Sequence, residues 1–281
     1  MRHPGCAGIV VVRDRVHGIL RSAQRVGKSG GIGDHGLNQA WPVHRHDTID
    51  STNSEARRRA QAGSFENCWI LADEQTAGRG RLQRNWASPK GNIFTTALFR
   101  EPGGIQVAGR IPFAAALAVS DTALEYAPGA DVRLKWPNDV RVNKAKLSGI
   151  LIETGQDAQG FWVIAGMGVN VAQVPPEAGQ AATCLADLSG MQALDHIDVF
   201  GSLTRHFMTR LAQARDGFGP VRTDWLKRAE GLGGMVRVSP GGVAIEGIFE
   251  DMAPDGGLIL RLPDGSRQTI RAGDVHLIGE V

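Results

Sequence analysis

This sequence has few cysteines, little net charge and no long apolar run, and each of these absences argues against a class of protein. The 281 residues include three cysteines, Cys6, Cys68 and Cys184, which are widely spaced and form no CxxC pair. This pattern argues against a disulfide framework and a cysteine metal site, and it predicts reduced core thiols in a cytoplasmic protein. The formal net charge is +2, which gives no overall basic field, so nucleic-acid binding would need a local basic patch.

Long apolar runs are also missing. The apolar stretch Cys6–Val12 ends at Arg13, too early for a signal-peptide core, and no other run approaches the length of a membrane span. We therefore expect neither export nor a membrane partner. The hydrophobic share of 42% is ordinary for a globular protein, so the chain can bury a sizeable core.

Changes in texture divide the chain into three parts. Residues 1–40 are rich in glycine and arginine without any lasting period, and we expect a poorly ordered extension. The "GKS" at 27–29 resembles the end of a phosphate-binding P-loop, but Ser22 stands where that motif needs a glycine. Residues 41–230 alternate strand and helix patterns and predict the main folded domain. Residues 231–281 hold short apolar strands between turns and predict a small β-barrel domain.

Within 41–230 the patterns predict an α+β fold, with helices packed on a mixed or antiparallel sheet. Antiparallel hairpins are indicated where turn residues such as "VNKAK" and "DAQG" separate apolar runs. The expected strands are 43–49, 68–75, 92–99, 132–139, 147–155 and 161–171, and the expected helices lie within 50–63, 107–126, 194–214 and 221–229.

The stretch Asp73–Trp86, "DEQTAGRGRLQRNW", places three arginines around two glycines between two predicted strands. Glycine lets backbone N–H groups approach a ligand closely, and guanidinium groups grip carboxylate or phosphate oxygens from several directions. The loop therefore predicts an anion site. A solvated basic turn or a contact to nucleic acid is the alternative, but the stretch lacks the arginine–glycine repetition expected of the latter.

Four separated segments together resemble the biotin protein ligases: "DSTN" at 50–53, "EQTAGRGR" at 74–81, "KWPND" at 135–139 and "KLSGILIE" at 146–153. "GMGVNV" at 166–171 and the C-terminal strands are also similar to that family, so the resemblance runs from about Trp41 to the C-terminus. It implies a catalytic domain like that of class II aminoacyl-tRNA synthetases, followed by a small SH3-like β-barrel.

The resemblance implies a two-step reaction. ATP and biotin give biotinyl-5'-AMP and pyrophosphate, and biotin then passes to a lysine of the biotin carboxyl carrier protein of acetyl-CoA carboxylase or a related carboxylase. The first step brings two anions together and adds negative charge at the α-phosphate, so cations must stabilise it. Mg²⁺ is expected as the counterion of ATP, held mainly by phosphates and water, and no metal site built by the protein is expected.

The resemblance also implies roles for residues. Lys146 and Arg81 are the expected catalytic residues, and the loop 78–81 is expected to cover the adenylate. The expected biotin-binding residues are Ser51, Thr52, Asn53, Gln75, Arg79, Gly80, Arg81 and Lys146. The expected ATP or adenylate residues are Gly78, Arg84, Trp86, Lys135, Asn138 and Asn170.

Simpler roles compete for some of these residues. A helix N-cap would explain Ser51–Asn53 without a ligand, and a buried core position would explain Trp86. The chain has Gln83 where the family usually has glycine, which leaves the role of Arg84 open.

Three other functions compete with biotin ligation. A lipoate or octanoate ligase can use the same architecture, but its acyl chain does not need the polar set "DSTN" plus Gln75. A biotin-sensing transcription regulator would need an N-terminal DNA-binding domain, and residues 1–40 show no pair of capped helices. A binding module without activity is disfavoured by Arg81 and Lys146. A homodimer stays among the expected assemblies.

Overall fold

The structure, a computed structural model, describes residues 41–175, 181–191 and 194–278. The expectations for residues 1–40 lie outside the described residues. In chain order the elements are β1 Val43–His46, α2 Thr52–Gln61, β2 Cys68–Ala72, η1 Arg81–Gln83, β3 Ile93–Arg100, α3 Gly104–Ala108, α4 Ile111–Tyr126, β4 Val132–Lys135, β5 Asp139–Val142, β6 Ala145–Asp157, β7 Gly160–Val169, α5 Leu185–Ser189, α6 His196–Asp216, α7 Phe218–Lys227, β8 Met235–Val238, η2 Pro240–Gly242, β9 Ile245–Met252, β10 Leu258–Arg261, β11 Arg267–Ile270 and β12 Val275–Leu277.

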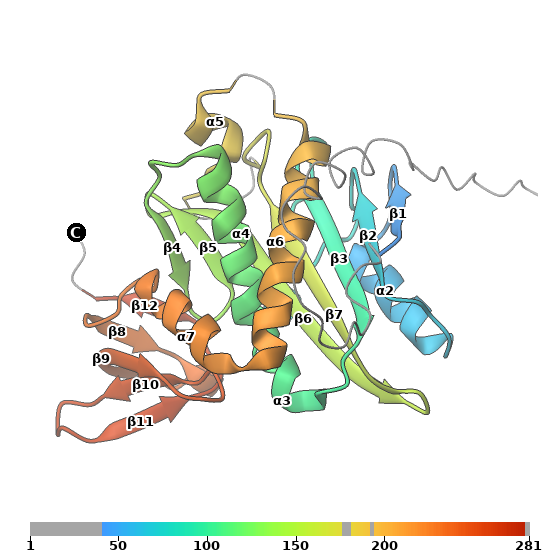
Figure 1. Ribbon diagram of the computed structural model, residues 1–281. Coiled ribbons are helices and arrows are strands. Elements are labelled where there is room, and N and C mark those ends of the chain that lie inside the picture. The colour runs from blue at the N-terminus through green and yellow to red at the C-terminus, as the bar shows by residue number, and fades with distance from the viewer. Residues whose placement is uncertain (1–40, 176–180, 192–193, 279–281) are drawn as a thin grey trace, which may run out of the picture.

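A seven-stranded sheet in the order β1-β2-β3-β7-β6-β5-β4 forms the centre of the molecule. Only the β1–β2 pair is parallel, and the other neighbours are antiparallel, so the sheet is mixed as expected. Figure 1 shows α4 and α6 lying side by side across one face of this sheet. Helix α2 packs on β2, β3 and β7 over a separate cluster of buried side chains, which places it on the other face.

The long apolar segment Gly104–Tyr126 is the one helix, among the described residues, that is long and apolar enough to cross a membrane by length and composition alone. In the fold 72% of its most apolar window is buried inside the protein. Its polar side chains have partners there: Arg110 donates to the Ala214 carbonyl at 2.9 Å, and Asp121 pairs with Arg210 at 2.7 Å. These contacts are those of a core helix. The expected single helix at 107–126 is divided into α3 and α4 at Gly109–Arg110.

A second, five-stranded antiparallel sheet in the order β11-β10-β9-β8-β12 follows α7. One buried apolar cluster joins it to the first sheet, because Phe249 and Leu258 belong to the same core as Phe113 and Trp225. The Trp136 indole N–H also donates to the Gly256 carbonyl at 3.0 Å. The expected domain boundary at residues 230 and 231 stays a prediction, since the core is continuous across it.

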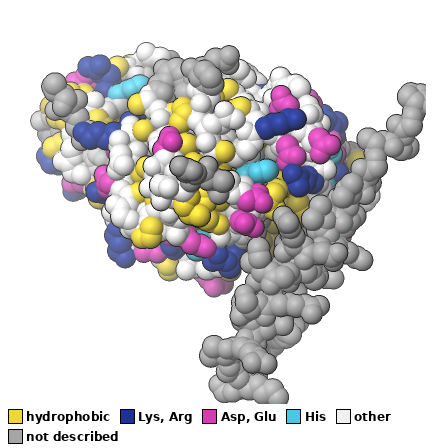
Figure 2. Space-filling model, turned by 90° about the horizontal axis from the view of Figure 1, so that it is seen from above, with side chains coloured by type: hydrophobic (Ala, Val, Ile, Leu, Met, Phe, Trp, Pro, Cys, Tyr) yellow, Lys and Arg dark blue, Asp and Glu magenta, His cyan; other side chains and the backbone are white. Residues whose placement is uncertain are grey.

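Figure 2 shows the molecule from above, with basic and acidic side chains interspersed on that face. No single basic stripe crosses the described part of this face. The view agrees with the small net charge of the whole chain.

Candidate active site

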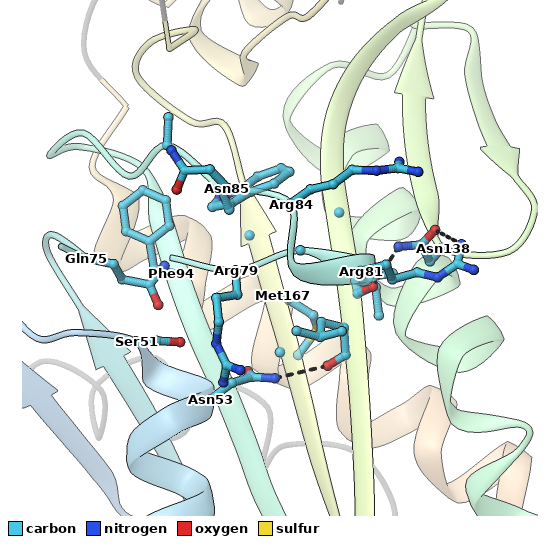
Figure 3. Close-up of a pocket in the computed structure, with 18 of the residues that line it drawn as sticks. Ser51, Asn53, Gln75, Arg79, Arg81, Arg84, Asn85, Phe94, Asn138 and Met167 are labelled. Atoms are coloured by element: carbon cyan, nitrogen blue, oxygen red, sulfur yellow. Dashed lines mark hydrogen bonds between the residues drawn. The ribbon is translucent and has the colours of Figure 1, made fainter. Parts of the chain in front are cut away.

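A cavity of about 230 Å³ opens on the α2 side of the main sheet, between the loop 78–86, the strands β6 and β7, and Asp274 of the second sheet (Figure 3). Most of the residues that the sequence predicted for the site line this cavity. They are Ser51, Thr52, Asn53, Gln75, Arg79, Gly80, Arg81, Arg84, Trp86, Asn138, Lys146 and Asn170.

Two predicted residues, Gly78 and Lys135, do not line the cavity. Gly78 begins the loop at a close approach to its other arm, where a Cβ atom would clash with the Trp86 carbonyl oxygen and lie 2.7 Å from the Ser88 hydroxyl. Lys135 ends β4, and its backbone faces Asp139 across the β4–β5 hairpin. Their assignment to the nucleotide stays a prediction.

Ser51 occupies the N-cap position of α2, but its side chain makes no capping hydrogen bond. The residue is only 3% exposed and borders the cavity. A buried hydroxyl normally has a partner. The N-cap interpretation therefore does not explain this side chain, which has its hydrogen-bonding capacity available for a ligand.

Thr52, Asn53 and Gln75 form a fixed polar network beside Ser51. Gln75 Oε1 accepts from the Thr52 N–H at 2.9 Å and from the Thr52 hydroxyl at 3.2 Å, while its amide donates to Ser88 at 3.0 Å. The Thr96 hydroxyl reaches Asn53 Oδ1 at 2.6 Å. Because these groups are already paired, they shape one wall of the cavity and hold its polar atoms in place.

Trp86 lies against a flat part of the sheet formed by two glycines. Gly149 and Gly168 are cross-strand neighbours on β6 and β7. A Cβ atom on Gly149 would lie 2.9 Å from the indole, and one on Gly168 would lie 2.6 Å from it. The ring is half-buried and its Nε1 has no partner among the described residues. Only glycine at both positions leaves room for the indole beside the cavity.

Lys146, at the start of β6, is held by a carboxylate that sequence analysis did not single out. Its Nζ lies 2.9 Å from Asp139 Oδ1 and 5.3 Å from the centroid of the Trp86 ring. Both partners of the ion pair are largely buried. Asp139 is the last residue of "KWPND", so the motif contained a signal for it, but aspartate at the end of a strand is also typical of a turn.

The arginines of the loop reach different partners (Figure 3). Arg79 donates to the Ser54 hydroxyl at 3.1 Å, and Arg81 donates to Asn138 Oδ1 at 3.2 Å. Arg81 also reaches the Gly273 carbonyl at 3.3 Å and Asp274 at 3.4 Å, and Arg84 forms an ion pair with the same carboxylate.

The charge of Asp274 depends on these arginines. Burial by itself would raise the pKa of this carboxyl, but the hydrogen bond and charge of Arg84, together with the charge of Arg81, outweigh burial and hold the pKa below its usual value. The same contact raises the pKa of Arg84. No motif in the sequence marks Asp274, because it follows β11 in a segment about 190 residues after the loop.

Asn170, immediately after β7, has one acceptor without a partner. Its amide nitrogen donates to the Thr183 carbonyl at 3.1 Å, which fixes the side chain, and its buried Oδ1 has no partner within the part of the chain that the structure describes. A strand-end role does not require this arrangement. The unpaired oxygen borders the cavity and suits a ligand N–H group.

The described residues contain no group of three or more histidine, cysteine, aspartate or glutamate side chains that could hold a metal ion. The acidic side chains at the cavity are Asp139 and Asp274. Since Mg²⁺ often uses one or two carboxylates with phosphate oxygens and water, this donor set fits a nucleotide-bound Mg²⁺ better than a cage built by protein.

Comparison with known proteins identifies the family. Residues 47–170 match the model of the biotin/lipoate A/B protein ligase family, and residues 231–277 match that of the biotin protein ligase C-terminal domain. A biotin–[acetyl-CoA-carboxylase] ligase of Paracoccus denitrificans is 40% identical over 238 residues, covering 82% of this chain and 98% of the relative. The chain belongs to the biotin protein ligase family.

Two further similarities support this assignment. A biotin–[acetyl-CoA-carboxylase] ligase of Mycobacterium tuberculosis is 37% identical, over 81% of this chain and 86% of the relative. A solved biotin protein ligase of Aquifex aeolicus, in complex with biotin and ATP, superposes with a TM-score of 0.71 at 26% identity, over 84% of this chain and 97% of that one. The family resemblance, the α+β fold class and the assignment as a ligase are thereby confirmed.

Proposed function

We propose that this biotin protein ligase condenses biotin with ATP to biotinyl-5'-AMP and then transfers biotin to one lysine of a carrier domain of acetyl-CoA carboxylase or a related carboxylase. The observation that carries the proposal is the composition of the cavity. Four basic side chains, Arg79, Arg81, Arg84 and Lys146, line it beside a neutral polar wall, against two carboxylates. A site with excess positive charge next to fixed neutral donors and acceptors suits an acid and a phosphate together.

The neutral wall would hold the ureido ring of biotin. That ring offers two N–H donors and one carbonyl acceptor. The Ser51 hydroxyl is available, while Thr52, Asn53 and Gln75 keep the wall rigid through their own hydrogen bonds. A lipoyl or octanoyl chain would leave the Ser51 hydroxyl without a partner, at a cost in binding free energy. The wall therefore favours biotin.

The basic side chains would act in the adenylation step. The biotin carboxylate attacks the α-phosphorus of ATP, the bond to the β-phosphate oxygen breaks, and pyrophosphate leaves. Lys146, positioned by Asp139, and Arg81, positioned by Asn138, would stabilise the negative charge on the reacting oxygens. When bound, Mg²⁺ would neutralise part of the triphosphate charge, with Asp139 as the available carboxylate at that end of the cavity.

Trp86 and Asn170 would recognise the adenine. The exposed part of the Trp86 ring offers an apolar face to a purine, and Asn170 Oδ1 is a fixed acceptor for the exocyclic amine. Lys135 and Gly78, which do not line the cavity, would support nucleotide binding from outside its wall. In the second step the carrier lysine attacks the acyl carbonyl as a free amine, and AMP leaves with the bonding electrons.

The carrier and the nucleotide would place the enzyme in the cytoplasm, and the interspersed surface charges give no support to a nucleic-acid partner.

The test of the proposed function is incubation of the purified chain with biotin, ATP, Mg²⁺ and a recombinant apo carrier domain, followed by mass spectrometry. We expect the mass of one biotinyl group on a single carrier lysine. As a control, a known biotin protein ligase should biotinylate the same carrier domain. If it does and this chain leaves the carrier unmodified, the proposal is contradicted.

A further inference from the structure

The loop 78–86 is itself a small hairpin that stands beside the cavity. The Trp86 N–H donates to the Gly78 carbonyl at 2.9 Å, and the Gly80 N–H donates to the Arg84 carbonyl at 2.8 Å. Arg79 and Asn85 form an antiparallel bridge between the two arms. The hairpin thus carries all three loop arginines on one folded unit.

The tip of this hairpin is strained. Leu82 has a φ of 54° and Gln83 a φ of 59°, a left-handed conformation that disfavours residues with a Cβ atom. Leu82 is also 75% exposed, so packing does not compensate for the strain. The pair forms a hairpin turn closed by the Arg84 backbone N–H, which donates to the Arg81 carbonyl at 3.1 Å. Such a turn favours asparagine and glycine at its two central positions, so leucine and glutamine there leave strain that contacts around the turn can offset. Contacts between residues next to this tip and the rest of the protein should therefore help to hold its backbone.

The second sheet supplies such a contact through one side chain. Asp274 pairs with Arg84 and lies 3.4 Å from Arg81, while the neighbouring Gly273 carbonyl accepts from Arg81 at 3.3 Å. Arg81 and Arg84 flank the strained pair on both sides. The Arg81 and Asp274 side chains are exposed by 25% and 32%, so water screens their contact less than it would a pair at an open surface, whereas Arg84 is exposed by 62%.

We propose that Asp274 is a positioning residue that fastens the strained hairpin to the second sheet, and so keeps Arg81 and Arg84 over the cavity. A phosphate that enters the cavity would share these guanidinium groups with Asp274, because each has several N–H donors. The inference relies on the proposed function for the identity of the ligand, whereas the fastening itself concerns the protein alone.

The test is hydrogen exchange followed by mass spectrometry on peptides that contain residues 78–86. Asp274→Asn keeps the shape of the side chain and removes its charge. We expect the amides of Gly80, Arg84 and Trp86 to exchange on the order of tenfold faster in the variant, because loss of a charged hydrogen bond shifts the hairpin toward open forms. Unchanged exchange at these amides would overturn the proposal.

Two further variants separate fastening from a general loss of structure. Asp255→Asn is the matched control, because it weakens the Asp255–Arg271 pair in the same sheet without touching the hairpin. Its exchange at 78–86 should equal that of the original chain. Gln83→Gly, added to Asp274→Asn, should recover part of the lost protection, since glycine adopts positive φ without strain. No recovery, or equal acceleration by Asp255→Asn, would contradict the account.

The functional readout is retention of the intermediate. Biotinyl-5'-AMP formed on the Asp274→Asn protein should pass through a filter several-fold faster than from the original chain, while the rate of its formation changes less, because Asp139 still positions Lys146. If the original chain forms no adenylate, the proposed function fails. The hydrogen-exchange experiment still tests whether Asp274 fastens the hairpin. Equal retention by both proteins would limit Asp274 to a structural role and overturn the positioning role.

Discussion

The two faces of the seven-stranded sheet differ in how completely their side chains are satisfied. On the face under α4 and α6, Trp69 packs edge-to-face against Phe207 at 5.3 Å between ring centroids, and both are almost wholly buried. On the cavity face, Gly149 and Gly168 leave room for one half-buried indole. Ser51 makes no capping hydrogen bond, and Asn170 Oδ1 has no partner among the described residues. The packed face provides stability, although it also buries the unpaired Ser148 hydroxyl, and the cavity face keeps polar groups for a ligand.

The largest expected effect tests the packed face. Phe207→Ala should lower the free energy of unfolding by about 3–5 kcal/mol, because it removes a buried aromatic ring and leaves a cavity beside Trp69 and Phe99. Urea denaturation measures the change, and Phe207→Leu should lose clearly less. A loss under about 1 kcal/mol would show that this face is not the stabilising one.

Lys146→Ala tests the cavity face. Loss of one cation aimed at developing charge should reduce adenylation by about two to three orders of magnitude, with little change in stability. Biotin-dependent exchange of pyrophosphate into ATP measures it, and Lys90→Ala, an exposed lysine outside the cavity lining, is the control. Near-normal exchange by Lys146→Ala would refute the assigned role.

Arg81→Gly should lose retention of the intermediate in addition to slowing its synthesis, because the same guanidinium group is assigned to both. Without the guanidinium group, biotinyl-5'-AMP should escape and biotinylate lysines of an added bystander protein such as albumin. Detection with labelled streptavidin measures this, and the unchanged chain should label the carrier alone. If the variant still makes biotinyl-5'-AMP and the bystander protein is not labelled, Arg81 is excluded as a residue that retains the intermediate.

Gly168→Ala tests the support for Trp86. The new methyl group would sit 2.6 Å from the indole in its present position, so the ring must move. We expect the KM for ATP to rise by about tenfold while the KM for biotin changes less, since adenine recognition is the function assigned to the ring. Steady-state kinetics with each substrate varied in turn measures both KM values. An equal rise in the two would contradict that assignment.

The smallest expected effect concerns Ser148, next to Gly149 in β6. Its hydroxyl is fully buried and has no partner among the described residues. Ser148→Ala removes that unpaired group, so stability should rise by roughly 1 kcal/mol, with activity unchanged. Thermal denaturation measures the gain. A loss of stability would indicate that the hydroxyl has a partner such as an ordered water molecule.

The sequence predicted the main elements where the apolar period was strong, as in β2, β3 and the β6–β7 hairpin. It also predicted most of the cavity lining, because "DSTN", "GRGR" and "KLSGILIE" are short segments whose residues stay together in the fold. It missed Asp274, because this contact joins residues far apart in the chain and depends on how the second sheet packs. It also missed the support of Trp86 by Gly149 and Gly168, since strand register cannot be read from either segment alone.

The proposed function requires that the cavity hold biotin beside ATP. The most direct test is exchange of labelled pyrophosphate into ATP with Mg²⁺ and, in parallel, biotin, lipoate or octanoate. The polar wall around Ser51 and Gln75 and the basic side chains beside it predict exchange with biotin alone. Exchange with lipoate or octanoate and none with biotin would contradict the assignment of the cavity to biotin.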